Sequence, residues 1–309
     1  MLPRVAVGVL GLAVALAAAP AAQEPIDSGA AFRGGVDLVS MNVTVTDRDN
    51  RYVRSLSDLD FAVYEDGVQQ EISFFSQSQL PLALSLLLDS SASMEQRLPT
   101  LQAAAVDFID RLQPSDIAQV IDFDSRVEIR QTFTRDQASL AQAIGRTVAG
   151  GSTSLYNALY ISLKELAKIR IESDEDVRRQ ALVVFSDGED TSSLVSFDEV
   201  LDLAKRSETA IYTIALRGED NSTRGFREAE FVMRQLAQET GGRPFSAASV
   251  DDLEGIYSQI ADELSSQYTI GYLPKNTRQD GAWRQLVVQV DRSDVTARTK
   301  RGYYAPTPN

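Results

Sequence analysis

The chain has 309 residues, enough for about two domains, and its composition is that of an ordinary globular protein, with 43% hydrophobic and 24% charged residues. Its net charge of −14 argues against nucleic acid as a partner, because binding phosphates requires a basic surface. The absence of cysteine and histidine excludes disulfides, thiolate and imidazole metal sites, a cysteine nucleophile and a Ser-His-Asp triad.

The first residues have the pattern of a secretory signal peptide. Arg4 precedes an apolar run over residues 5–19, and a small-x-small cleavage site ends at Ala21. The run is short for a membrane span of about 20 residues, so cleavage is favoured over an uncleaved anchor. We therefore expect residues 1–21 to be removed and the protein to be secreted or periplasmic, with no membrane span after cleavage.

Residues 22–79 follow as a β-strand segment. Residues 36–46 alternate between apolar and polar side chains, which indicates a half-buried antiparallel strand. Two more strands are expected at residues 61–67 and 70–75, around a Glu-Asp-Gly turn. This block is too small to bury a core on its own.

From about residue 80 to residue 266, strands and helices alternate. Residues 82–89 are almost continuously apolar, as in a strand that is buried on both faces of a parallel sheet, and residues 99–112 carry an apolar helical stripe. Further strands are expected at residues 116–123, 127–133, 181–188, 210–216 and 243–247, and further helices at residues 136–147, 155–169, 197–207 and 250–266, with another helix ending at residues 241–242. This alternation predicts an α/β domain with a doubly wound sheet.

After residue 266 the pattern returns to β. Three strands are expected, at residues 268–273, 283–290 and 295–304. Neither end of the chain closes a core alone, whereas the six strands together make a small sandwich. We therefore expect residues 22–79 and 267–309 to pair into one β-domain, with the α/β domain of residues 80–266 inserted between them.

Three polar clusters lie at strand ends or in a loop of the expected α/β domain. Asp89, Ser91 and Ser93 end the first central strand, Thr153 lies in a glycine loop before a helix, and Asp187 ends another buried strand. Each cluster by itself is also typical of an ordinary turn or helix cap. Together they indicate a site, because ligands bind at the carboxyl ends of the strands in an open α/β sheet.

The chemistry of these five side chains suits a hard divalent cation. Carboxylate and hydroxyl oxygens favour Mg²⁺, with Mn²⁺ or Ca²⁺ as further candidates. Neutral hydroxyl ligands leave an ion electrophilic, which favours an incoming acidic group over a sealed structural site. The expected helix starts after Ser93 and Thr153 would add partial positive charge for such an anion.

The segment "DSSAS", which begins at Asp89, resembles the Asp-x-Ser-x-Ser of the metal-ion-dependent adhesion site (MIDAS) in von Willebrand factor type A domains. Thr153 in "GGSTSLYNAL" is similar to the threonine of that site, and Asp187 in "FSDGED" to its final aspartate. The resemblance covers about residues 80–266. It implies a Rossmann-like domain that binds Mg²⁺.

The resemblance also implies a role for each ligand. Ser91 and Ser93 would coordinate the ion directly, and Asp89, Thr153 and Asp187 directly or through water. A Glu or Asp of an unidentified partner protein would fill the open position. The flanking segments, residues 43–75 and 268–306, resemble secreted bacterial proteins of the von Willebrand factor type A group that are common in Acidobacteria, which supports the fold and the location more than the function.

Two alternatives stay open. Glu95, Glu189 and Asp190 crowd the same expected edge, where they either build a second cation site or are solvated surface charge. The leading function is a cation-dependent adhesion or scaffold module, and the alternative is a structural envelope protein whose metal only stabilises the loops. A metal-dependent hydrolase is disfavoured, because the chain has no histidine base, no P-loop and no Gly-x-Ser-x-Gly motif.

Overall fold

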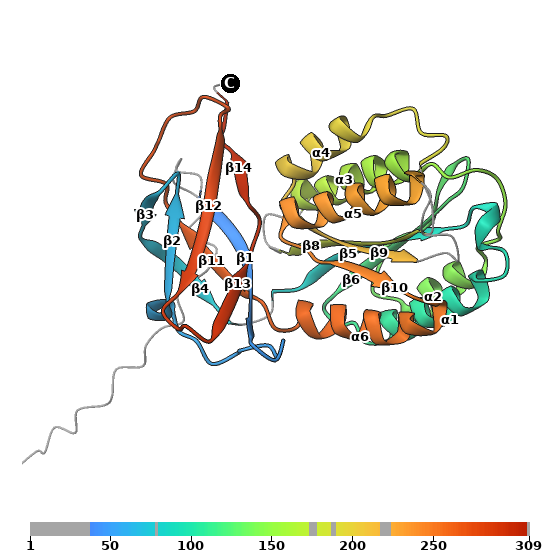
Figure 1. The fold of residues 1–309 in the computed structure, drawn as a ribbon, viewed down its shortest axis with the longest axis horizontal. Helices are drawn as coiled ribbons and strands as arrows, with labels where there is room; N and C mark the ends of the chain where they lie inside the picture. Colours follow the sequence, from blue (N-terminus) through green and yellow to red (C-terminus); the bar gives the residue numbers. More distant parts are fainter. Residues whose placement is uncertain (1–37, 78–79, 173–177, 187–189, 217–223, 308–309) are drawn as a thin grey trace, which may run out of the picture.

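The computed structural model describes residues 38–77, 80–172, 178–186, 190–216 and 224–307, which form an α/β domain beside a smaller β-domain (Figure 1). The expected signal peptide lies outside the described residues, as does the expected ligand Asp187. No helix in the described part of the chain has both the length and the apolar character needed to cross a bilayer.

A six-stranded sheet with the order β10-β9-β8-β5-β6-β7 forms the centre of the α/β domain. Its parallel strands are β5 (Leu82–Asp89), β6 (Ile117–Phe123), β8 (Arg179–Ser186), β9 (Thr209–Leu216) and β10 (Pro244–Ala247). The edge strand β7 (Val127–Thr134) is antiparallel to β6, because the short connection between them allows a hairpin but not a crossover.

Helices cover both faces of this sheet (Figure 1). One face carries α1 (Leu98–Ile109), α2 (Gln137–Gly145) and α6 (Leu253–Leu264), and the other α3 (Leu155–Glu172), α4 (Phe197–Arg206) and α5 (Arg224–Thr240). Every residue of β5 is buried, as expected for a strand that is covered on both faces. The predicted doubly wound α/β fold is confirmed.

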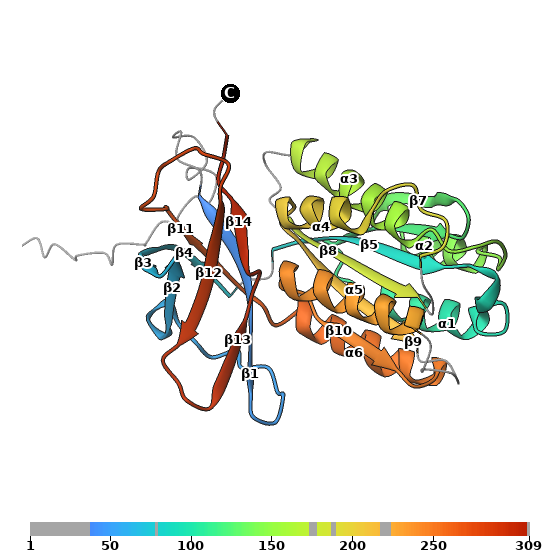
Figure 2. The same ribbon diagram turned by 45° about the horizontal axis from the view of Figure 1, so that its top comes forward.

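Strands from both ends of the chain form two four-stranded antiparallel sheets. The first, in the order β13-β1-β11-β4, contains β1 (Val39–Asp47), β4 (Ile72–Ser76), β11 (Tyr268–Tyr272) and β13 (Val295–Arg298). The second, in the order β14-β12-β2-β3, contains β2 (Phe61–Glu65), β3 (Val68–Gln70), β12 (Trp283–Val290) and β14 (Gly302–Tyr304). Because β1 pairs with β11 and β13, and β2 with β12, the predicted pairing of the two ends is confirmed (Figure 2).

Two strand predictions were wrong. The strand expected at residues 70–75 is divided, because Gln70 ends β3 of the second sheet and β4 of the first sheet begins at Ile72. The sequence suggested a single strand over residues 295–304, whereas β13 belongs to the first sheet and β14 to the second. The chain changes sheets between them, at a point where a Cβ on Gly302 would lie 2.3 Å from the carbonyl oxygen of Arg284. Side-chain alternation does not show such a change, because it reports which face a residue takes and not which neighbour its strand pairs with.

A polar cluster joins the two domains. Glu263, near the end of α6, is fully buried, accepts a hydrogen bond of 2.8 Å from the Tyr212 hydroxyl and forms an ion pair with Arg298 of β13. Arg298 also donates to the carbonyl oxygen of Gly241 at 2.6 Å. The β-domain therefore contacts the end of the sheet where β5 begins, and the carboxyl ends of the parallel strands point away from it (Figure 2).

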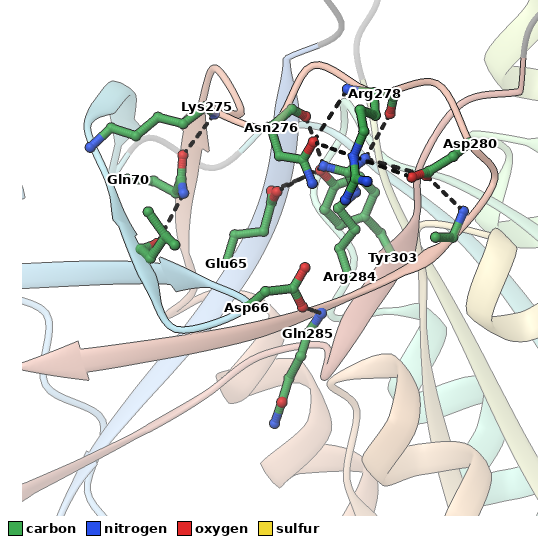
Figure 3. A network of polar contacts seen from close by, with 12 residues as sticks. Glu65, Asp66, Gln70, Lys275, Asn276, Arg278, Asp280, Arg284, Gln285 and Tyr303 are labelled. Carbon is green, nitrogen blue, oxygen red and sulfur yellow. Dashed lines mark hydrogen bonds and ion pairs between the residues drawn. The ribbon is translucent and has the colours of Figure 1, made fainter.

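A second buried charge pair lies inside the β-domain (Figure 3). The side chains of Arg284 and Glu65 are each 2% exposed, with Nη1 and Oε1 3.2 Å apart. The hydroxyls of Tyr272 and Tyr303 donate to Glu65 Oε2 at 2.6 and 2.8 Å. Arg284 Nη1 also donates to the carbonyl oxygen of Asn276 at 2.7 Å, so the pair anchors the loop before β12.

Candidate metal centre

The first predicted cluster lies at the carboxyl end of β5, in the middle of the sheet. Asp89 is the last residue of this strand and is fully buried. Its Oδ1 accepts a hydrogen bond of 2.9 Å from the backbone N–H of Ser91, and its Oδ2 one of 2.6 Å from the hydroxyl of Ser186. The carboxylate is therefore held in position by a hydrogen bond to each of its oxygens.

The two predicted serine ligands lie close together. Ser91 Oγ and Ser93 Oγ are 3.0 Å apart. Ser91 is buried and precedes the 3-10 helix Ala92–Met94, in which Ser93 is exposed. The turn places two hydroxyl oxygens side by side, one at the base of the site and one toward solvent.

The glycine loop that carries Thr153 packs against this turn. Gly150 N–H donates to the carbonyl oxygen of Ser90 at 2.8 Å, and Ala92 N–H donates to that of Gly151 at 3.1 Å. Gly151 has a φ of +69°, and a Cβ there would meet Ser125 Oγ at 2.9 Å, so both the conformation and the space require glycine. Thr153 is 6% exposed at the start of α3.

The third cluster is described only in part. Asp187 lies outside the described residues, but Ser186 ends β8, which is paired with β5. The chain after this point returns to Thr153, whose carbonyl oxygen accepts from the N–H groups of Thr191 and Ser192 at 2.8 and 3.1 Å. The structure thus brings Asp89, Ser91, Ser93 and Thr153 to one edge of the sheet, and Asp187 follows directly after a residue bonded to Asp89.

The three acidic residues considered for a second cation site do not form one among the described residues. Glu95 is exposed, and Glu189 lies outside the described part of the chain. Asp190 Oδ1 accepts from the backbone N–H of Tyr156 at 3.1 Å and from the Ser193 hydroxyl. Asp190 therefore orients the first turn of α3, which is a structural role.

The hydrogen-bond partners of the first turn of α3 were not identified from the sequence. Asn157 Oδ1 accepts from the backbone N–H groups of Leu194 and Val195 at 3.1 and 3.3 Å, and the Ser193 hydroxyl accepts from the N–H of Asn157 at 2.9 Å. The sequence signal that could have indicated these contacts is residue type, because Asn, Asp and Ser are common helix-capping residues. Their partners lie more than thirty residues away along the chain, so spacing alone could not identify them.

A buried carboxylate on the neighbouring strand was also missed. Asp122 of β6 is 3% exposed, and burial raises the pKa of its carboxyl group. Arg130 Nε lies 2.8 Å from Asp122 Oδ2, and this hydrogen bond opposes the rise in pKa. Because Asp122 already has a guanidinium partner, we assign it to the pairing of β6 with β7 rather than to the site.

The donor set at this edge suits a hard, hydrated cation. It consists of one buried carboxylate and three hydroxyls among the described residues, and hard divalent cations prefer such oxygen ligands. The hydroxyls of Ser154 and Ser192, which flank Thr153 and its partner Thr191, are buried with no hydrogen-bond partner among the described residues. No group of three acidic side chains gathers in the described part, so the candidate site depends on hydroxyls.

Residues 84–189 match the family model described as von Willebrand factor type A domain. An uncharacterized protein of Synechocystis sp. is 40% identical over 114 residues, which make up 36% of this chain and 26% of that protein. Calcium-activated chloride channel regulator 1 of Bos taurus is 28% identical over 189 residues, or 59% of this chain and 19% of that protein. The chain thus spans only a minor part of the length of these relatives.

Two solved structures share the fold. A von Willebrand factor type A structure from Catenulispora acidiphila has a TM-score of 0.52 at 12% identity, covering 90% of this chain and 76% of that one. The vWF domain of the type V pili tip protein Mfa5 from Porphyromonas gingivalis has a TM-score of 0.50 at 15% identity, covering 60% and 95%. At these identities the likeness shows the fold, which is that of a von Willebrand factor type A (VWA) domain.

Proposed function

We propose that this VWA-domain protein is a non-enzymatic binding module, an adhesion or scaffold protein that grips a carboxylate of a partner protein through a divalent cation. Asp89, Ser91, Ser93, Thr153 and Asp187 would hold Mg²⁺, or Mn²⁺ or Ca²⁺ in its place. The bound ion would supply an open coordination position for a Glu or Asp of the partner. The observation that carries the proposal is the pair of serine oxygens 3.0 Å apart beside the buried Asp89.

The exposure of the ligands supports a partner that arrives from solvent. Asp89 and Ser91 lie at the buried base of the site, whereas Ser93 is exposed. A carboxylate of the partner would therefore approach on the side of Ser93. The chain has no histidine and no cysteine to act as a base or nucleophile, which supports binding over catalysis.

The alternative is a structural envelope protein in which the metal only stabilises the loops. Backbone hydrogen bonds already join these loops, from Gly150 to Ser90, from Ala92 to Gly151 and from Thr191 to Thr153. Because these bonds need no ion, we expect the loops to stay folded without one. This expectation favours the binding function.

The comparisons and the β-domain extend the proposal. The Mfa5 domain belongs to a pili tip protein, which supports an adhesive role for the shared fold. We also propose that the protein is a secreted or periplasmic member of the Acidobacteria-type group, cleaved near Ala21. Residues 80–266 would be the VWA domain, and residues 22–79 and 267–309 one β-domain, as the pairing of β1 with β11 suggests.

Calorimetric titration of Mg²⁺, Mn²⁺ and Ca²⁺ into the metal-stripped protein tests the site. Ser93→Ala removes an exposed ligand, and Ser73→Ala removes an exposed hydroxyl of β4 as the matched control. We expect saturable binding by the wild type and by Ser73→Ala, and at least about tenfold weaker binding by Ser93→Ala. Equal affinity of all three proteins would remove the serine pair from the site.

Circular dichroism with and without EDTA separates the two functions. A binding module keeps its spectrum when the metal is removed, because its loops are held by backbone hydrogen bonds. A protein with a structural metal site loses secondary structure or unfolds, because the ion contributes to folding. Loss of the folded spectrum in EDTA would support the structural alternative.

A further inference from the structure

A surface pocket of about 480 Å³ lies between the first turn of α3 and the N-terminal half of α5. Among the described residues it is lined by Tyr156 of α3 and by Arg227, Glu228, Phe231 and Val232 of α5. The start of α3 lies at the carboxyl end of β6, because the N–H of Ser154 donates to the carbonyl oxygen of Asp124 at 2.8 Å, and α5 follows β9. The pocket therefore lies at the same edge of the sheet as the candidate metal centre. None of these residues belongs to the predicted ligand set.

Tyr156 connects the pocket to the metal centre. It follows Thr153 by three residues, a stretch of chain that reaches at most about 11 Å when fully extended. The backbone N–H of Tyr156 donates to Asp190 Oδ1, and its ring lies 6.0 Å from that of Phe197. The wall of the pocket is thus held by the same segment, residues 190–197, that contacts Thr153.

One large apolar side chain of the pocket is exposed, and another is exposed beside the first turn of α3. Phe231 is 62% exposed although it belongs to a helix with a buried face, to which Val232 contributes at 8% exposure. Leu194 is 94% exposed, and its backbone N–H is held by Asn157 in the first turn of α3. Exposed apolar groups that gather beside a polar site mark interaction surfaces more often than isolated ones do.

The pocket is lined by one basic and one acidic residue, Arg227 and Glu228. Glu228 already has an interaction partner within the molecule. Arg227 is exposed and has no hydrogen bond or ion pair within the described part of the chain. An acidic group of a partner is therefore the complement that Arg227 lacks, although the whole chain carries a net charge of −14.

We propose that the partner of this protein presents an acidic segment in which a large apolar side chain lies close to the metal-bound carboxylate. The apolar side chain enters the pocket between Tyr156 and Phe231, and a second carboxylate of the same segment pairs with Arg227. The pocket thereby discriminates among acidic segments, which the metal ion by itself would bind with equal affinity. The discriminating side chains are those of Tyr156, Phe231 and Arg227. This inference rests on the function proposed above, because the first carboxylate is placed by the cation.

The test selects peptides from a random displayed library on the immobilised full-length protein in Mg²⁺ and elutes them with EDTA. We expect enriched peptides to carry two acidic residues and an aromatic or large aliphatic residue between or beside them. Affinities of the strongest peptide are then measured for the wild type, Phe231→Ala and Arg227→Ala. Leu59→Ala, an exposed apolar residue of the β-domain, and Arg234→Ala, which pairs with Glu230 further along α5, are the matched controls.

We expect each pocket substitution to weaken binding about tenfold and each control to leave it unchanged, because burying an apolar side chain or pairing a charge contributes on that scale. Two results would overturn the role of the pocket and leave the metal function standing. In the first, the metal-dependent peptides show no preference for an apolar residue. In the second, they bind Phe231→Ala with full affinity. Peptides that need Phe231 but bind equally in EDTA would overturn the metal function instead. Absence of any enriched peptide would overturn both.

Discussion

The hydroxyl of Ser186 donates a hydrogen bond of 2.6 Å to Asp89 Oδ2. This bond connects the last residue of β8 to the last residue of β5. Both side chains are almost fully buried, and their strands are adjacent and parallel, with Leu88 opposite Phe185. The bond orients the Asp89 carboxylate before any ion binds. Asp187, another predicted ligand, is the next residue after Ser186 in the sequence.

Ser186→Ala is therefore expected to weaken cation binding without removing a ligand. Partners that orient a metal ligand typically contribute about 10- to 100-fold in affinity, whereas one lost hydrogen bond costs about 1 kcal/mol of unfolding free energy. Calorimetric titration and denaturant unfolding measure the two effects. Ser246→Ala, at an exposed position of β10 in the same sheet, is the control, and an unchanged affinity in Ser186→Ala would contradict the orienting role.

Arg284→Ala is expected to destabilise the β-domain strongly. It leaves Glu65 buried without its guanidinium partner, and breaking a buried ion pair from one side costs about 3–5 kcal/mol. Arg278→Ala is the matched control in the same loop, because its side chain is 77% exposed, and we expect a change within about 0.5 kcal/mol. Denaturant unfolding gives both values, and similar losses in the two variants would rule out a special role of the buried pair.

Two glycine substitutions should have opposite effects on stability. A Cβ on Gly242 would lie 1.9 Å from the carbonyl oxygen of Ile211, so Gly242→Ala must displace backbone and is expected to cost about 3 kcal/mol or more. Gly255 lies in α6 with nothing within 4 Å of an added Cβ, and Gly255→Ala is expected to stabilise by about 0.5–1 kcal/mol. A stable Gly242→Ala protein would show that the strand and the α5–β10 connection separate easily.

The free energy of unfolding should fall at alkaline pH. Burial raises the pKa of Tyr52 to about 12, and burial together with the hydrogen bond to Glu65 raises the pKa of Tyr272. Unfolded tyrosines ionise near pH 10, so between pH 10 and 12 the folded chain holds protons that the unfolded chain releases. The stabilisation is complete below pH 10 and is lost as the pH rises toward the folded pKa.

Denaturant unfolding at stepwise pH, with tyrosinate absorbance as the second signal, checks this dependence. We expect the free energy of unfolding of Tyr52→Phe to decline less steeply than that of the wild type between pH 10 and 12, because the substitution removes one group with a raised pKa. Parallel declines in the two proteins would show that Tyr52 does not contribute.

The elements of the α/β domain could be predicted because their signals are local. The apolar run of residues 82–89 indicates a strand that is covered on both faces. The helices that cover it were predicted from the helical spacing of apolar residues in the neighbouring segments. The change of sheet between β13 and β14 could not be predicted, because it depends on which strands receive them. The same holds for the Asp190 and Asn157 network, whose partners are distant along the chain.

The sequence by itself determined the strand and helix order of the α/β domain, the oxygen-rich composition of the candidate site, and the absence of cysteine and histidine chemistry. These properties depend on residue type and on spacing within a few positions. The tertiary structure alone decided that Ser186 bonds to Asp89, that Arg298 meets Glu263 between the domains, and that Tyr156 and Phe231 share a pocket. Such contacts join residues far apart in the chain, and only packing of the whole fold brings their atoms within a few ångströms of each other.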